Sequence, residues 1–134
     1  MGLSPYAMIC TAAGEEKRIE DFRPGDTVRE ALTGRSLEVV NCLNSPGVGM
    51  MRIHVEGDII LDLTGDQNLL TDSGMLAVQR IAAGTGIRVK GGFARCTGVE
   101  AILGDYMVYD LVLENVPDAE PWIIANSLVV SVRQ

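Results

Sequence analysis

The chain has 134 residues, 47% of them apolar, and a net charge of −7. This size and composition exclude a disordered chain and a string of several domains, and they predict one domain, residues 1–134, with a buried core. The acidic balance argues against nucleic acid as a partner, which needs a basic face, and every apolar run is shorter than the roughly 20 residues that span a membrane.

Short segments rich in β-branched or alternating residues follow one another along the chain. We expect strands at residues 7–11, 27–31, 36–41, 50–55, 59–63, 86–90, 96–103, 107–114 and 122–132. Glycine-containing turn signals, such as those at residues 24–26, 45–47 and 56–58, separate these strands. Residues 19–23 and 76–82 allow about one helical turn each, too short to be stable without packing. The chain is therefore predicted to be all-β.

One pattern occurs twice, about sixty residues apart. The first copy comprises Thr11, Gly14, Ile19, Phe22, Gly25 and Val28, and the second, with one residue deleted, comprises Thr71, Gly74, Val78, Ile81, Gly84 and Ile87. Downstream, the alternating segments 51–56 and 109–114 both end in a glutamate. The repetition predicts a duplicated unit, about residues 7–70 and 71–132, and hence a pseudo-two-fold body. In each copy we expect the short helical stretch to plug the sheet with two apolar side chains.

The cysteines and the sole histidine give little sign of chemistry. Cys10, Cys42 and Cys96 are far apart and lie in or beside apolar stretches, so we interpret them as small buried residues in a reducing compartment. No secretory signal opens the sequence, which favours a cytoplasmic location. His54 alternates with apolar residues and is expected to face solvent or a neighbouring strand. With no paired-cysteine spacing, we expect no metal site and no cofactor.

Four segments resemble those of a Hint domain, the hedgehog/intein self-processing module, in the same order and at the same spacing. They are residues 15–28, 63–74, 108–114 and 124–131. The resemblance covers nearly the whole chain and implies a β-rich horseshoe built by duplication. It also implies an acyl shift, in which a Cys or Ser at the first residue attacks the preceding carbonyl while a histidine helps the amide nitrogen to leave. In the splicing branch, a terminal histidine-asparagine pair cyclises.

The chain departs from the family at the residues that carry this chemistry. The nucleophile position falls at Gly2, which has no side chain, and Cys10 lies eight residues too late to replace it. Gln67 stands in place of the histidine of the family's T-x-x-H segment and cannot shuttle a proton near neutral pH. The terminal histidine-asparagine pair maps onto Ser131 and Val132. The resemblance thus implies the fold without the reactive groups.

Of the family's polar groups, Thr64 and Asp110 remain, and Pro121 stands where members often carry another histidine. Thr64, Gln67 and Asp110 are expected to line the cleft of the peptide junction and to hydrogen-bond a peptide backbone. The sequence therefore predicts a catalytically silent, folded or interaction module whose partner is a flanking polypeptide or another peptide or protein. Two alternatives stay open, an inactivated variant of an active splicing or cleavage domain and an unrelated small β domain. The oligomeric state does not follow from the sequence.

Overall fold

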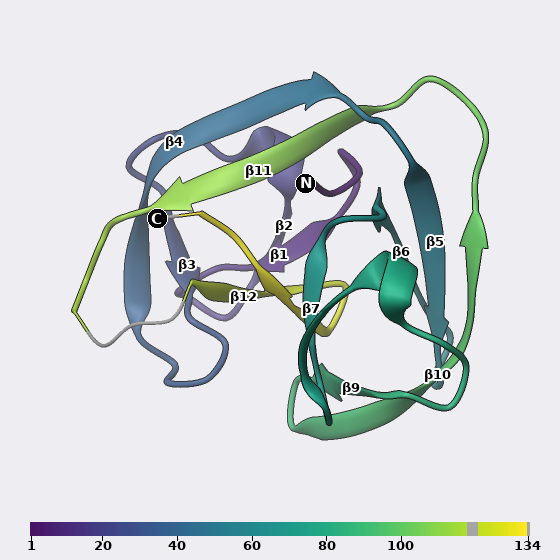
Figure 1. Ribbon diagram of the computed structural model, residues 1–134. Coiled ribbons are helices and arrows are strands. Elements are labelled where there is room, and N and C mark those ends of the chain that lie inside the picture. The colour runs from purple at the N-terminus through teal and green to yellow at the C-terminus, as the bar shows by residue number, and fades with distance from the viewer. Residues whose placement is uncertain (118–120, 134) are drawn as a thin grey trace.

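The computed structural model in Figure 1 describes residues 1–117 and 121–133, which form strands and two single-turn 3₁₀ helices. The strands are β1 (Met8–Cys10), β2 (Glu16–Arg18), β3 (Thr27–Arg29), β4 (Ser36–Pro46), β5 (Met50–Val55), β6 (Ile59–Thr64), β7 (Asn68–Thr71), β8 (Gly74–Ala77), β9 (Gly86–Val89), β10 (Gly92–Ala101), β11 (Met107–Leu113), β12 (Trp122–Ala125) and β13 (Leu128–Ser131). The helices are η1 (Ile19–Asp21) and η2 (Val78–Arg80). The predicted all-β class is confirmed.

The strands form two sheets. The larger has the order β2-β1-β12-β13-β7-β9-β10-β5-β6, with β8 paired to β7, and the smaller has the order β11-β4-β3. The long strands β4 and β11 run side by side across the top of Figure 1, and β5 and β10 turn away from their ends down one side. Leu3 forms bridges to both Leu63 of β6 and Tyr109 of β11. The N-terminal segment thus joins the two sheets.

The repeat detected in the sequence recurs as matched backbone hydrogen bonds. The bond from Ile19 N to Ala7 O matches the bond from Val78 N to Gln67 O. The bond from Gly25 N to Val39 O matches the bond from Gly84 N to Cys96 O, and the bond from Glu114 N to Glu38 O matches the bond from Glu56 N to Arg95 O. The last pair involves the two glutamates that close the alternating segments. The pseudo-two-fold horseshoe built from a duplicated unit is therefore confirmed.

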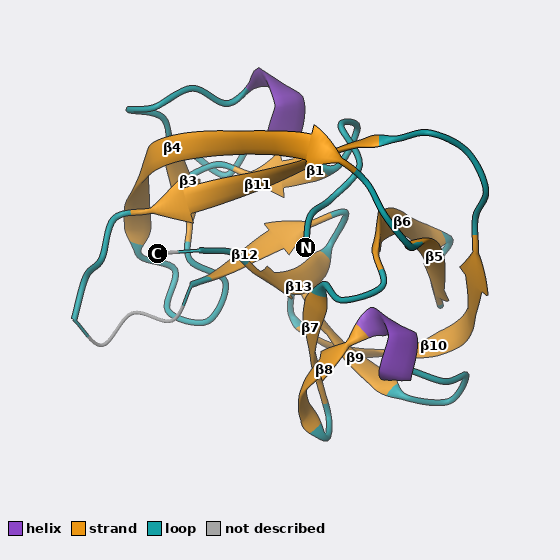
Figure 2. Cartoon of the chain, turned by 45° about the horizontal axis from the view of Figure 1, so that its top comes forward, coloured by secondary structure: helices purple, strands orange, loops and turns teal. Residues whose placement is uncertain are grey.

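The two 3₁₀ helices lie at opposite ends of the molecule (Figure 2) and act as the expected apolar plugs. Ile19 and Phe22 in the first copy, and Val78 and Ile81 in the second, belong to one buried cluster. Each helix is a single turn, shorter than the stretches 19–23 and 76–82 that the sequence allowed. The chain is extended again at Phe22 and Ile81, and residues 76 and 77 belong to β8.

The structure corrects several predicted strand boundaries. The expected single strand at residues 122–132 is a hairpin, β12 and β13, which turns at Asn126 and Ser127 with φ of 47° and 71°. Positive φ at both central positions is the geometry of a type I′ turn, whose twist suits a tight hairpin. The strands β2, β7 and β8 were not predicted, and β4 runs to Pro46 because it pairs with β11.

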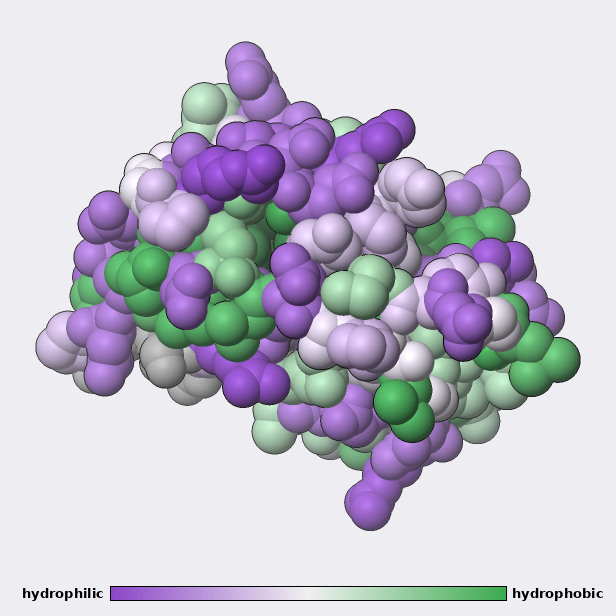
Figure 3. All heavy atoms as spheres, turned by 90° about the horizontal axis from the view of Figure 1, so that it is seen from above, coloured by the Kyte–Doolittle hydropathy of each residue, from purple (hydrophilic) through white to green (hydrophobic). Residues whose placement is uncertain are grey.

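Cys10 and Cys96 are buried, whereas Cys42 is only partly so, and all three thiols are free. His54 places its Nε2 atom 3.4 Å from Glu100 Oε1 on the neighbouring strand β10, as one of the two expectations for this residue stated. Hydrophilic and hydrophobic side chains are interspersed on the face seen in Figure 3. Within residues 1–117 and 121–133, no helix is long and apolar enough to cross a membrane.

Candidate functional site

Gly2 lies buried where the N-terminal segment enters between β6 and β11. Its N donates to Thr64 Oγ1 at 3.0 Å, and its O accepts from Thr64 N at 3.0 Å. The next residue, Leu3, pairs with Tyr109 through Leu3 N to Tyr109 O at 2.9 Å and Tyr109 N to Leu3 O at 2.8 Å. These four bonds fix the position at which the resemblance predicted the nucleophile.

There is no room for a side chain at this position. A Cβ atom on Gly2 would lie 2.9 Å from both Cβ and Cγ2 of Val108 and 3.2 Å from Tyr109 O. Such distances are below van der Waals contact, so any larger residue needs Val108 or the backbone to move. The close packing of Val108 against Gly2 has no local signature in the sequence, because the two residues belong to distant segments.

Thr64 connects Gly2 to a carboxylate that the sequence had not singled out for this site. Its hydroxyl accepts from Gly2 N and donates to Asp66 Oδ1 at 2.6 Å. The hydrogen bond from Thr64 lowers the pKa of Asp66, because it stabilises the ionised carboxylate. Both functions of the Thr64 hydroxyl, donor and acceptor, are therefore used within the chain.

Gln67 ties the loop before β7 to β13. It is 1% exposed, and its Nε2 donates to Ser131 O at 2.8 Å, with Ser131 Oγ at 3.3 Å and Asn68 O at 3.2 Å. The structure thus brings together two of the predicted site residues, Gln67 and Ser131, through an amide that is neutral at every ordinary pH. Near them, Val132 N donates to Pro121 O at 2.8 Å.

Among the predicted residues, Asp110 lines a cavity. The cavity has a volume of about 280 Å³ and is bordered by Met1, Leu43, Asn44, Ser45, Val108, Asp110 and Arg133. Asp110 accepts from Leu111 N at 2.9 Å and from Arg133 Nε at 2.8 Å. Burial raises the pKa of Asp110 above its usual value, although the hydrogen bond from Arg133 opposes this shift. Arg133, near the end of the chain, was missed because nothing local marks it as the partner of β11.

The side chains at the predicted positions form hydrogen bonds to other segments of the chain. At the four predicted positions with polar side chains stand two hydroxyls, an amide and a carboxylate, from Thr64, Ser131, Gln67 and Asp110. Every buried side-chain N or O atom in the described residues has a hydrogen-bond partner. In the same part of the chain, no group of three or more histidine, cysteine or acidic side chains is placed to hold a metal ion.

Comparison with solved structures identifies the architecture. The gp41-1 intein superposes with a TM-score of 0.82 and 20% identity over 97% of each chain. A DnaB intein from Synechocystis sp. PCC 6803 gives 0.80 and 15% over 99% of each chain, and the MchDnaB-1 intein gives 0.80 and 15% over 96% of this chain and 98% of its own. The sequence matches no known protein-family model and no curated protein. The chain has the intein-like Hint fold from end to end.

Proposed function

We propose that this chain is a Hint-fold domain that neither cuts nor splices itself and that serves as a folded or interaction module beside a flanking polypeptide. The observation that carries the proposal is the closed position 2, where Gly2 packs against Val108 and its amide is bonded to Thr64. The acyl shift needs a thiol or hydroxyl within about 3–3.5 Å of the carbonyl that it attacks. Position 2 supplies neither the group nor the space for it.

The second support is the amide at position 67. A leaving amine must be protonated as its bond to carbon breaks, and Gln67 cannot give a proton near neutral pH. Its Nε2 is instead bonded to Ser131 O. Removal of the nucleophile alone costs some other enzymes about 10⁶ in rate, equivalent to about 8 kcal/mol of barrier. Loss of both groups leaves no route to a measurable reaction.

The remaining polar groups act as structural ties under this proposal. Thr64 holds the N-terminal segment, Gln67 holds β13, and Asp110 holds the segment that carries Arg133. Each tie joins segments that are distant in sequence. The reactive positions of a self-processing domain would then have been converted into cross-links that keep both ends of the domain packed.

The test is the intact mass of the chain fused to folded tags at both ends, followed over days with and without dithiothreitol. We expect one uncut mass in both conditions. The matched comparator combines Gly2→Cys with Gln67→His, which returns a thiol and an imidazole to the two positions, and thermal unfolding checks that it folds. Separation of the tags from the unaltered chain would overturn the proposal and would direct attention to Cys10 and Ser131.

A further inference from the structure

Strand β11 separates two cavities, because successive side chains of a strand point to opposite faces. Val108 and Asp110 line the cavity of about 280 Å³ described above, whereas Met107 and Tyr109 line one of about 620 Å³ on the other face. We propose that this second cavity, the tyrosine groove, binds an extended peptide that carries an arginine or lysine side chain. The inference goes beyond the proposed function, since binding here does not depend on whether the chain cuts itself.

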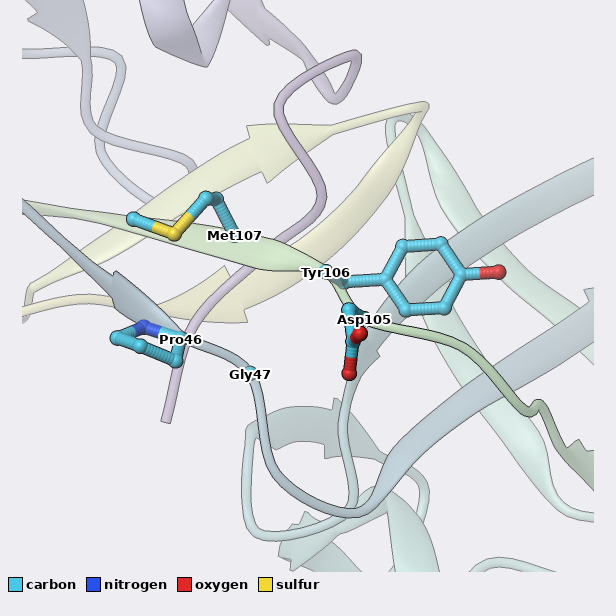
Figure 4. Close-up of a pocket in the computed structure, with 5 residues that line it drawn as sticks. All are labelled: Pro46, Gly47, Asp105, Tyr106 and Met107. Atoms are coloured by element: carbon cyan, nitrogen blue, oxygen red, sulfur yellow. The ribbon is translucent and has the colours of Figure 1, made fainter.

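The walls of the groove are aromatic. All three tyrosines of the chain, Tyr6, Tyr106 and Tyr109, line it. Tyr6 is 66% exposed, and the ring of Tyr106 projects away from Pro46 and Met107 (Figure 4). The faces of such rings attract cations, and the Tyr106 hydroxyl donates to Leu103 O at 3.3 Å. The groove therefore offers contacts to a flat or cationic side chain.

The charges in the groove favour a cation. Its lining includes the carboxylates of Glu20, Asp62 and Asp105 and the guanidinium of Arg52. Arg52 is already bound by both oxygens of Asp62, with Nε to Oδ1 at 2.7 Å and Nη2 to Oδ2 at 2.9 Å. This bidentate pair neutralises itself, so Asp105 and Glu20, which Arg18 contacts from the rim, leave the lining of the groove with a negative charge. A basic side chain complements that charge.

The chain itself shows how a guanidinium is held at the rim. Arg18 lies 5.2 Å from the centre of the Tyr6 ring and places Nη1 3.4 Å from Glu20 Oε1. Its side chain is 52% exposed and the ion pair is long, so this contact is readily exchanged. A guanidinium from a peptide finds the same ring and carboxylate, and Arg18 acts as an internal competitor for them.

The backbone at the groove favours a peptide over an isolated cation. The pairing of Leu3 with Tyr109 stops at Ser4, because Ala7 N donates to Ser4 O at 3.1 Å and the chain turns away. Pro5, which antiparallel register would set opposite Met107, has no N–H to offer. Along a strand, the backbone N–H and C=O groups of every second residue point to the same edge, so those of Met107 point to the edge where Tyr109 pairs with Leu3. The N-terminal segment has already turned away at that place. An extended peptide can continue the ladder there.

The probe is the peptide acetyl-Thr-Val-Arg-Val-Thr-amide, titrated calorimetrically into the whole chain, with a glutamate version as the matched peptide. We expect the arginine peptide to bind at least tenfold more tightly, and Tyr6→Ala and Asp105→Asn each to weaken it by about three- to tenfold. Arg18→Ala is expected to tighten binding about twofold or more. Both substituted residues in the groove are exposed, so folding is retained.

Asp72→Asn, at an exposed carboxylate that lines a different cavity, serves as the control and is expected to leave the affinity unchanged. Asp110→Asn tests the cavity on the other face of β11. Equal binding of the two peptides, or no effect of Tyr6→Ala and Asp105→Asn, would overturn the proposal. Loss of binding in Asp110→Asn alone would place the peptide in the other cavity and equally overturn it. Free arginine amide that bound as tightly as the peptide would refute the backbone pairing. The tag-fusion assay is read separately, so cutting of the chain leaves these outcomes interpretable.

Discussion

The two copies of the duplicated unit share a backbone but differ in the side chains placed on it. The first residue of each 3₁₀ helix donates its N–H to an equivalent carbonyl: Ile19 of the first copy to Ala7 O at 2.8 Å, and Val78 of the second copy to Gln67 O at 2.9 Å. Ala7 is an apolar core residue, whereas the buried amide of Gln67 binds Ser131. The repetition thus builds the scaffold, and the departures from symmetry build the polar site.

The equivalent strands β5 and β11 differ in the same way. β5 is flanked by β6 and β10, whereas β11 has β4 on one side and, on the other, only short segments around Leu3 and Arg133. The edge of β11 is therefore covered by the two ends of the described chain. Both the polar cavity and the tyrosine groove lie beside this edge of β11, where segments of both copies meet.

The largest effect is expected from breaking the plugs that the two copies share. Phe22 is 1% exposed and belongs to the same buried cluster as Ile81. Phe22→Ala should lower the free energy of unfolding by about 3–5 kcal/mol and Ile81→Ala by about 2–4 kcal/mol, because each leaves a cavity. Urea denaturation measures both losses. Leu103→Ala, at a residue 94% exposed, is the control and should change stability by less than about 0.5 kcal/mol.

A loss near zero for either plug would mean that the copies are not equivalent in packing. Phe22→Ala should lose more stability than Ile81→Ala, because phenylalanine is the larger side chain and should leave the larger cavity. A greater loss at Ile81 would show that the second copy carries more of the stability than the first.

A smaller effect is expected where the N-terminal segment meets β11. Gly2→Ala should cost about 1–3 kcal/mol, because its Cβ atom would lie 2.9 Å from Val108. In a Val108→Gly background, which removes both Cβ and Cγ2 of residue 108, the cost should fall, and urea denaturation of the four proteins in this double-mutant cycle gives the coupling. Gly98→Ala is the matched control, since a Cβ there meets nothing within 4 Å. Additive effects at positions 2 and 108 would contradict the closed packing.

Much of the scaffold was predictable because it rests on local patterns. Alternation located β5 with its bounds, and the repeated glycines and apolar residues located the duplicated unit and both plugs. The hairpin at Asn126 and Ser127 was missed, because an apolar run through a two-residue turn also fits one long strand. The short strands β7 and β8 were missed because pairing with other strands, more than their own residues, makes them extended.

The site was predictable only in part, and for a related reason. The resemblance to Hint domains pointed to Gly2, Thr64, Gln67, Asp110 and Ser131, and the structure joins Gly2 to Thr64 and Gln67 to Ser131. The partners Asp66, Val108 and Arg133 belong to contacts across the fold. Such contacts depend on how distant segments meet, so no spacing in the sequence announces them.

The smallest effect is expected from two carboxylates, one in each copy, whose titration changes the stability in opposite directions. Asp26, in the first copy, accepts from Lys17 Nζ at 2.8 Å and from Arg23 N at 2.8 Å, and these bonds lower its pKa. Its contribution is present above the pKa of the unfolded chain and is lost as the pH falls through the folded-state pKa. Asp110, in the second copy, has its pKa raised by burial, so the folded state retains its proton to higher pH.

For Asp110 the sign is reversed, because stability falls as the pH rises from the unfolded pKa, about 3.9, through the higher folded-state pKa. In urea denaturation at neutral pH, the free energy of unfolding of Asp26→Asn should lie below that of the unaltered chain by less than about 1 kcal/mol. This difference should shrink as the pH falls from 7 to 3. The stability of Asp110→Asn should increase relative to that of the unaltered chain as the pH rises, whatever constant cost the loss of the Arg133 ion pair adds. Differences that moved in the same direction would show that Asp110 is not held in the buried setting that distinguishes the second copy.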